Sequence, residues 1–340
     1  MVNQLAPFPW FGGKRRVAAD VWAAFGDVPN YVEPFAGSLA VLLERPSWHT
    51  GTIETINDLD MFVANFWRAL SLDPEAVAFH ADWPVNEADL FARHLWLVNE
   101  GRRQLRDNLD YDPEWYDARI AGWWVWGQCA WIGSGWCSGD GPHTYPTDSN
   151  AGRGVNRQLP HMGDAGRGVN RQLPHMGNAG QGVNRQLPHM GNAGQGVLPR
   201  NGALQTYMQD LARRLRRVRV ACGDWTRVVT PSVTERHGVT GVFLDPPYGD
   251  GAVDYSVGGN QTGDIAEDVR RWAIANGDNP LLRIALCGYE PVDMPTGWRK
   301  HRWKARKGYQ VETTNPAREI VWFSPHCLHM KRTLFDFQEA

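Results

Sequence analysis

The chain has 340 residues, of which 42% are hydrophobic and 21% are charged, and this composition excludes wholesale disorder. The length suggests two domains, or one domain that carries a large insertion. The formal net charge is −2, and no apolar run approaches the roughly 20 residues that cross a bilayer, so we expect no membrane partner.

The five cysteines are odd in number and none of their spacings is CxxC. This argues against a disulfide framework and a metal site, and together with a start that lacks a charged-then-apolar leader it favours an intracellular setting. Charge is unevenly distributed, because residues 73–120 are acidic on balance and residues 151–219 are strongly basic. Such asymmetry indicates a surface for an anionic partner. The excess of arginine over lysine suits phosphate recognition, and a GC-rich coding sequence explains it equally well.

Strands and helices alternate at the start of the chain. Residues 30–33 predict the end of a buried strand, followed by a glycine turn at 35–37 and a helix from 38 to about 45. The β-branched residues 52–56 predict a second strand that ends at 57–58. Residues 86–107 predict a helix that begins after the N-cap Asn86.

The middle of the chain contains near-identical 14-residue repeats over 151–197. Each unit has three glycines, one proline and few apolar side chains, so it is neither a helix nor a source of core. Two interpretations remain open. The repeats are a tolerated expansion of a surface loop, or one unit contacts DNA through its Arg, Asn and Gln.

After the repeats, apolar residues at helical spacing from Leu204 to Val218 predict an amphipathic helix. Off its apolar stripe lie Arg213, Arg214, Arg216 and Arg217. Together with Arg219, these arginines either form a solvated face or contact phosphates. Residues 239–244, 282–286 and 319–323 predict three more strands. The alternation of strands with helices predicts an α/β sheet.

The strongest local motif is Asp245-Pro246-Pro247-Tyr248, directly after an apolar strand. Ligands of open α/β sheets bind at the carboxyl ends of strands. Prolines lack backbone donors, so the Asp245 carboxylate and the Pro246 carbonyl form two acceptors for the two hydrogens of an exocyclic amine, and Tyr248 offers a face for stacking. A turn that simply follows a strand is the alternative.

Four further motifs accompany this one. Residues 9–14 (PWFGGK), 31–41 (YVEPFAGSLAV), 56–60 (INDLD) and 222–225 (CGDW) precede 245–248 (DPPY). In this order they resemble the motifs of the Dam-like, D12 class of N6-adenine-specific DNA methyltransferases, with tryptophan in place of phenylalanine at position 225. The resemblance covers roughly residues 7–70 and 218–325.

The resemblance implies an α/β, Rossmann-like, S-adenosylmethionine-dependent methyltransferase sheet with an inserted, mainly helical and loop-rich target-recognition subdomain. It places a discontinuous catalytic domain at 1–61 and 201–330, the insertion at 62–200 and a tail at 331–340. The methyl group passes to the amine of a flipped adenine in double-stranded DNA. We expect a monomer, or a dimer on DNA, in the cytoplasm of a bacterial or phage-infected cell.

The resemblance also assigns roles to residues. The catalytic residues are Asp245, Pro246, Pro247 and Tyr248. S-adenosylmethionine binds at Trp10, Gly12, Gly13, Lys14, Glu33, Pro34, Phe35, Gly37, Asp58, Asp224, Trp225 and Asp245. Physical arguments support two of these assignments. A glycine at a strand-to-helix turn, here Gly37, lets the backbone approach a ligand closely. An acid about 20 residues later, here Asp58, is placed to accept ribose hydroxyls.

DNA contacts are expected in two regions of the chain, residues 131–157 and residues 302–307. Trp123, Trp124 and Trp126 are expected in the core of the helical insertion, whereas Trp131 and Trp136, set among glycines, are candidates for stacking where the target base leaves the duplex. Candidate contacts to DNA are Arg153, Arg157, Arg302, Lys304, Arg306 and Lys307. The phenylalanine of the family's G-x-F-N-V-P stretch is missing near Arg157, so the arrangement of base contacts stays open.

Two rival functions remain. A cytosine-N4 methyltransferase presents a similar amine, although such enzymes more often have Ser in place of the motif's Asp. A catalytically silent DNA-binding module is the second rival. A restriction-modification partner and phage-borne protection are both compatible with the chain.

Overall fold

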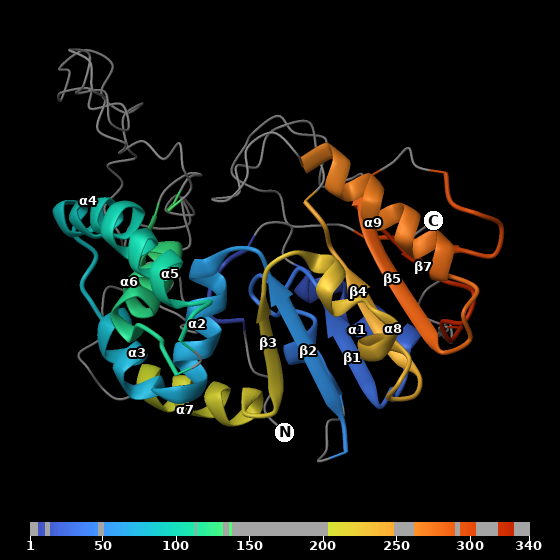
Figure 1. The fold of residues 1–340 in the computed structure, drawn as a ribbon, viewed down its shortest axis with the longest axis horizontal. Coiled ribbons are helices and arrows are strands. Elements are labelled where there is room, and N and C mark those ends of the chain that lie inside the picture. Colours follow the sequence, from blue (N-terminus) through green and yellow to red (C-terminus); the bar gives the residue numbers. More distant parts are fainter. Residues whose placement is uncertain are drawn as a thin grey trace, which may run out of the picture.

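The computed structural model describes residues 6–10, 14–46, 51–112, 114–131, 136–137, 203–247, 262–289, 293–303 and 319–329. Within them, the structure is a mixed α/β fold built on a seven-stranded sheet of order β3-β2-β1-β4-β5-β7-β6 (Figure 1). The prediction of an α/β sheet is therefore confirmed.

Five parallel strands form most of the sheet: β1 (Asn30–Glu33), β2 (Ile53–Asp58), β3 (Val218–Cys222), β4 (Thr240–Leu244) and β5 (Leu282–Tyr289). β7 (Glu319–Phe323) runs antiparallel to β5 and to β6 (Arg299–Arg302). The central strands are short apolar runs because helices cover both faces of such a sheet. All residues of β1, β4 and β7 are buried.

Two apolar cores lie on the two faces of the sheet. On one face, Val242 and Leu244 of β4 pack with Val269 and Ala273 of α9 (Thr262–Asn276). Phe243, which points the opposite way, joins the larger core that includes α1 (Arg15–Phe25). α8 (Pro231–Thr234) contacts β1.

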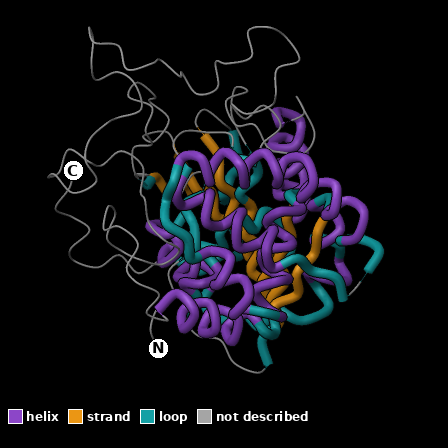
Figure 2. Tube along the Cα trace, turned by 90° about the vertical axis from the view of Figure 1, so that its left-hand side faces the viewer, coloured by secondary structure: helices purple, strands orange, loops and turns teal. Residues whose placement is uncertain are grey.

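Beyond the β3 edge, a group of helices gathers in space, as Figures 1 and 2 show. They are α2 (Met61–Leu72), α3 (Pro74–Ala81), α4 (Glu87–Trp96), a π-helical turn η2 (Leu97–Gly101), α5 (Arg102–Asn108), α6 (Ala118–Ala130) and α7 (Ala203–Leu215). α7 belongs to the segment expected in the catalytic domain, and it packs against α2 and α3.

Side-chain caps begin these helices. The carboxylates of Asp60, Asp73 and Asp117 accept hydrogen bonds from the first turns of α2, α3 and α6. Asn86 caps α4 as expected, with its Oδ1 accepting from the Ala88 amide at 2.9 Å. The predicted helix over 86–107 is therefore present, and η2 interrupts it.

The helix predicted from 38 to about 45 is wrong. The chain turns there and forms only a short 3₁₀ helix, η1 (Leu42–Glu44). Gly37 and Leu39 both have positive φ, 45° and 58°, and a left-handed residue cannot continue an α-helix. No helix in the described ranges is long and apolar enough to cross a membrane.

Candidate functional site

The carboxyl ends of the parallel strands bring several acidic side chains to one edge of the sheet. Glu33 ends β1, Asp58 ends β2, and Asp245 follows β4. The charges of Asp245 and Asp58 both act on Glu33, whose pKa is raised well above its usual value, mainly by burial. Glu33 also accepts a hydrogen bond of 2.9 Å from the Tyr31 hydroxyl. The edge is therefore a concentrated set of carboxyl groups.

Lys14 is the cation at this edge. Its ammonium Nζ lies 3.0 Å from Asp245 Oδ2 and 3.8 Å from Glu319 Oε2, and only 6% of its side chain is exposed. The Trp303 ring lies 5.8 Å from the same nitrogen. A buried ammonium needs such partners. Lys14 and Asp245, both predicted as site residues, are thus brought together.

Pro246 and Pro247 follow Asp245 at the end of β4, so this stretch of backbone has no N–H donors beside the carboxylate. Tyr248, Gly12 and Gly13, which were also predicted as site residues, lie outside the described residues.

The turn after β1 requires a glycine. Gly37 has a φ of 45°, and a Cβ at this position would overlap the ring of Trp10. The Gly37 amide donates to Asp58 Oδ2 at 2.9 Å, while its carbonyl accepts from Trp67 Nε1 at 3.1 Å. The turn is thus fastened to β2 and to α2, with Trp10 packed over its glycine.

Asp58 is held by backbone donors on both oxygens. Oδ2 accepts from Gly37 and Oδ1 accepts from the Asp60 amide at 2.9 Å. Burial, reinforced by the negative charge of Asp60, raises the pKa of Asp58 to about 7. The group therefore changes charge near neutrality.

Asn57 joins the loops that follow β1 and β3. Its Nδ2 donates to the carbonyls of Pro34 and Gly223, each at 3.0 Å. Its Oδ1 is buried and has no hydrogen-bond partner among the described residues. A buried acceptor left in this way beside the turn is a candidate contact for a bound ligand.

Two predicted aromatic side chains meet across these loops. The rings of Phe35 and Trp225 lie 6.2 Å apart between centroids, at 31° to each other, and Trp225 is buried against Trp272 of α9. Exposed Asp224 caps the 3₁₀ helix η4 (Trp225–Val228) by accepting from the Thr226 amide at 2.9 Å. Phe35 and Trp225, both predicted to bind the cofactor, are therefore adjacent.

The two tryptophans expected to contact DNA lie in the core. Trp131 and Trp136 are each only 7% exposed. His94 stacks on Trp131 at 5.2 Å, and Trp136 Nε1 donates to the Trp124 carbonyl at 2.9 Å. Gly127 leaves room for the Trp136 ring, which a Cβ there would overlap. The expectation that these rings stack where a base leaves the duplex is corrected, because a buried ring has no face to offer.

The expected core role is confirmed for Trp124 and Trp126, which are 1% exposed, whereas Trp123 is partly buried. Arg302 is exposed at the end of β6. The other candidate DNA contacts, namely Arg153, Arg157, Lys304, Arg306 and Lys307, fall outside the described residues.

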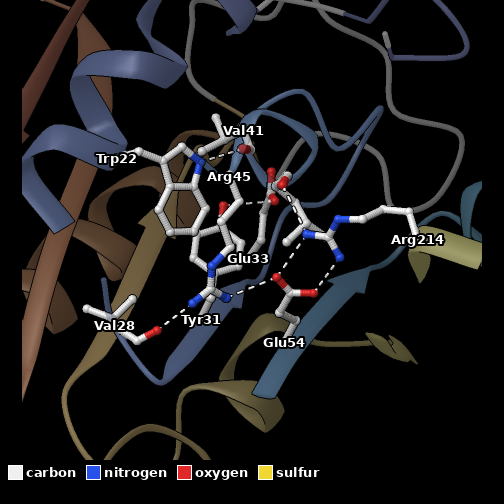
Figure 3. A network of polar contacts seen from close by, with 9 residues as sticks. Trp22, Val28, Tyr31, Glu33, Val41, Arg45, Glu54 and Arg214 are labelled. Atoms are coloured by element: carbon white, nitrogen blue, oxygen red, sulfur yellow. Dashed lines mark hydrogen bonds and ion pairs between the residues drawn. The ribbon is translucent and has the colours of Figure 1, made fainter. Parts of the chain in front are cut away.

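Arg214 also differs from the expectation of a phosphate contact or a solvated face. It is buried and binds Glu54 of β2 through two hydrogen bonds of 2.7 and 2.9 Å. Arg45 binds the same carboxylate at 2.9 Å and donates to the Val28 carbonyl (Figure 3). The three side chains form a buried ion network that connects α7 with the sheet.

Sequence reasoning missed three residues at the edge of the sheet: Glu319, Cys287 and Tyr31. The Cys287 thiol lies beside Asp245, and burial raises its pKa well above the usual value. Glu319 was recognised only as the start of a strand. Within the described part of the chain, no group of three or more metal-binding side chains comes together.

Comparison with known proteins identifies one family. Residues 10–99 match the D12 class N6 adenine-specific DNA methyltransferases, so the predicted resemblance is confirmed over this range. The seven-stranded α/β sheet is consistent with a methyltransferase fold. No curated protein sequence matches the chain. The match contains Lys14, Gly37 and Asp58, ends before Asp245, and supports DNA methyltransferase activity.

Proposed function

We propose that the chain is a DNA adenine-N6 methyltransferase that takes its methyl group from S-adenosylmethionine and acts on double-stranded DNA. One observation carries the proposal: the Lys14–Asp245 ion pair at the end of β4, beside the rigid backbone of Pro246 and Pro247. This arrangement presents an oriented carboxylate and a carbonyl where an open sheet binds its ligands. The family match over residues 10–99 supports the same activity.

The charged side chains at this edge suit S-adenosylmethionine. Glu33, Asp58, Asp245 and Glu319 all carry carboxyl groups here, and Lys14 is the cation paired with them among the described residues. Such a site favours a ligand that brings positive charge, and this cofactor carries a sulfonium and an ammonium group. Asn57 Oδ1, which has no partner within the described ranges, is one further acceptor for a donor of the ligand.

Particular residues would hold the cofactor. The Gly37 turn allows close approach of the backbone, Asp58 accepts ribose hydroxyls, and the adenine ring packs beside Phe35 and Trp225 with Asp224 accepting from its amine. When bound, the cofactor supplies an electrophilic methyl group on a positively charged sulfur, which keeps the electron pair of the bond that breaks.

The protein's part in the reaction is to bind and orient the target amine. The lone pair of adenine N6 is delocalised into the ring, so the amine is a weak nucleophile. Acceptance of its two hydrogens by the Asp245 carboxylate and the Pro246 carbonyl favours a tetrahedral nitrogen and stabilises the positive charge that develops there. Alignment of the amine with the methyl group contributes further. The base must leave the duplex to reach this edge.

The test is to incubate the purified chain with isotopically labelled S-adenosylmethionine and mixed-sequence duplex DNA, and to identify the methylated nucleoside by mass. We expect N6-methyladenine from the wild type and at least about a 100-fold lower rate from Asp245→Asn. Asp268→Asn, which makes the same change on the exposed face of α9, should keep the wild-type rate. Cofactor binding by Asp245→Asn, measured by calorimetry, should stay measurable.

Other outcomes discriminate between the rivals. If the product is N4-methylcytosine, the target base is cytosine instead of adenine, and the proposed roles of Asp245 and Pro246 still hold. Cofactor binding without any methylation of DNA would contradict the proposed substrate. Loss of both would favour a silent DNA-binding module.

A further inference from the structure

The last strand of the described sheet brings a second carboxylate to the candidate active site. β7 runs antiparallel to β5, and its first residue, Glu319, is paired with Tyr289 of β5. Tyr289 lies beyond Leu286, the last residue of β5 that pairs with β4. Glu319 is 5% exposed. An antiparallel strand thus places its beginning at the same edge as the carboxyl ends of the parallel strands.

Lys14 lies between this carboxylate and that of Asp245. Its Nζ is 3.0 Å from Asp245 Oδ2 and 3.8 Å from Glu319 Oε2. Glu319 Oε2 is buried and accepts no hydrogen bond from the part of the chain that the structure describes. A small rotation of the lysine side chain would bring its ammonium within hydrogen-bond distance of Glu319. The Lys14 ammonium therefore connects the Asp245 carboxylate, after the end of β4, with the Glu319 carboxylate at the start of β7.

The proposed reaction leaves a proton to be removed. When the amine nitrogen uses its lone pair to form the new bond to carbon, it becomes positively charged and still carries two hydrogens. One of them must depart as a proton to give the neutral methylated amine. Asp245 is the first acceptor in reach of that proton, but Asp245 must return to the carboxylate form before another amine can bind.

We propose that Glu319 is a positioning residue for this reaction: it holds the Lys14 ammonium against Asp245, and receives through Lys14 the proton that the methylated amine loses. Asp245 takes the proton from nitrogen; Lys14 passes one of its own protons to Glu319 and takes the proton from Asp245. The ammonium and the Asp245 carboxylate are thereby restored, and Glu319 becomes the neutral acid. This inference rests on the proposed function.

The surroundings of Glu319 suit a proton acceptor. Burial raises its pKa to about 7, while the Lys14 charge lowers it and the Asp245 charge raises it. Among the described residues, the other titratable groups near this set are Cys287 on β5, Glu33 on β1 and Tyr289, which is paired with Glu319 in the sheet. A group with this pKa both accepts and releases a proton near neutrality.

The first experiment measures steady-state methylation of duplex DNA, over several turnovers, between pH 6 and pH 9. The wild-type rate should fall as the pH drops below about 7. Glu319→Gln should be slower by about tenfold or more at pH 8 and lose this dependence, with KM for DNA and cofactor changed less than about twofold. Glu319→Asp should restore the pH dependence. Glu267→Gln, an exposed acid on α9, is the matched control and should behave as the wild type.

A second experiment needs neither cofactor nor DNA. In protein labelled with ¹³C at glutamate carboxyl groups, the signal absent from Glu319→Gln should titrate near pH 7. In Lys14→Met it should titrate at higher pH, because the lysine charge lowers this pKa. This readout also serves if a variant is inactive, and thermal unfolding of each variant shows whether it folds.

The outcomes separate the two proposals. A wild-type rate and pH profile in Glu319→Gln, or a Glu319 signal that Lys14→Met does not move, would overturn the role of Glu319 and leave the proposed function standing. A wild type that methylates no DNA would overturn both.

Discussion

The ion network of Glu54, Arg45 and Arg214 offers a direct test of how the helical group is attached to the sheet. We predict that Glu54→Gln destabilises the protein strongly, because glutamine keeps the volume but removes the only anion that the two buried guanidinium groups share within the described contacts. The Glu54 side chain is 5% exposed, and those of the arginines are 1% and 7% exposed. Water therefore compensates neither cation.

The magnitude follows from this geometry. Removing one partner of a buried ion pair costs about 3–5 kcal/mol, because the charge that remains has lost its compensation. Arg214→Met should cost less, about 1–3 kcal/mol, since Glu54 keeps its bond to Arg45 and loses two hydrogen bonds. In the double variant the losses should not add, because one of the two guanidinium groups left uncompensated by Glu54→Gln is itself absent.

The assay is urea unfolding followed by tryptophan fluorescence and circular dichroism at constant pH. Glu75→Gln, which weakens an exposed contact with Gln209, is the control and should change the free energy of unfolding by less than about 0.5 kcal/mol. A loss for Glu54→Gln no greater than that of Glu75→Gln would refute the reasoning, as would additive losses in the double variant.

Three further predictions concern single positions. Gly37→Ala should weaken S-adenosylmethionine binding by about tenfold or more in calorimetry, because positive φ and the Trp10 ring both oppose a Cβ; unchanged affinity would count against the turn as a cofactor site. Trp136→Ala should lower the free energy of unfolding by about 3–5 kcal/mol, whereas a ring that served only to contact DNA would leave stability unchanged. Because the folded chain raises the pKa of Glu319 to about 7, it binds this proton more tightly than the unfolded chain does. The free energy of unfolding should therefore fall by about 3 kcal/mol from this group as the pH rises from about 4 to about 8. Glu319→Gln should remove that part of the decline in urea titrations at several pH values.

Much of the central sheet was predictable because its strands are short apolar runs that end in polar residues. β7 has the predicted bounds, β1 ends at the predicted residue, and β2, β4 and β5 begin within one residue of their predicted starts. The family resemblance predicted both Lys14 and Asp245 as site residues, and the structure adds their contact. The left-handed backbone of Leu39 carries no local signal, because leucine favours a helix.

The errors at Trp131, Trp136 and Arg214 share a cause. The glycines around the two tryptophans indicated an exposed loop. One of these glycines, Gly127, instead makes space for the Trp136 ring in the core. Arg214 is buried because Glu54, far away in the sequence, neutralises it. Such pairing depends on tertiary contacts that periodicity does not contain. Glu319 was overlooked for a related reason, since the direction of β7 decides which of its ends faces the site.

The order of the strands has a consequence for biosynthesis. β1 lies between β2 and β4, and paired residues Asn30 and Thr240 are 210 positions apart in the chain. At about 5–20 residues per second, translation supplies β4 about 10–40 s after β1. β2 pairs with one edge of β1 early in synthesis. The other edge of β1, all of whose residues are buried in the folded protein, has no strand to pair with until β4 has been made. An unpaired apolar edge invites association with other chains, so the nascent chain exposes the centre of its own sheet to such association until β4 has been made.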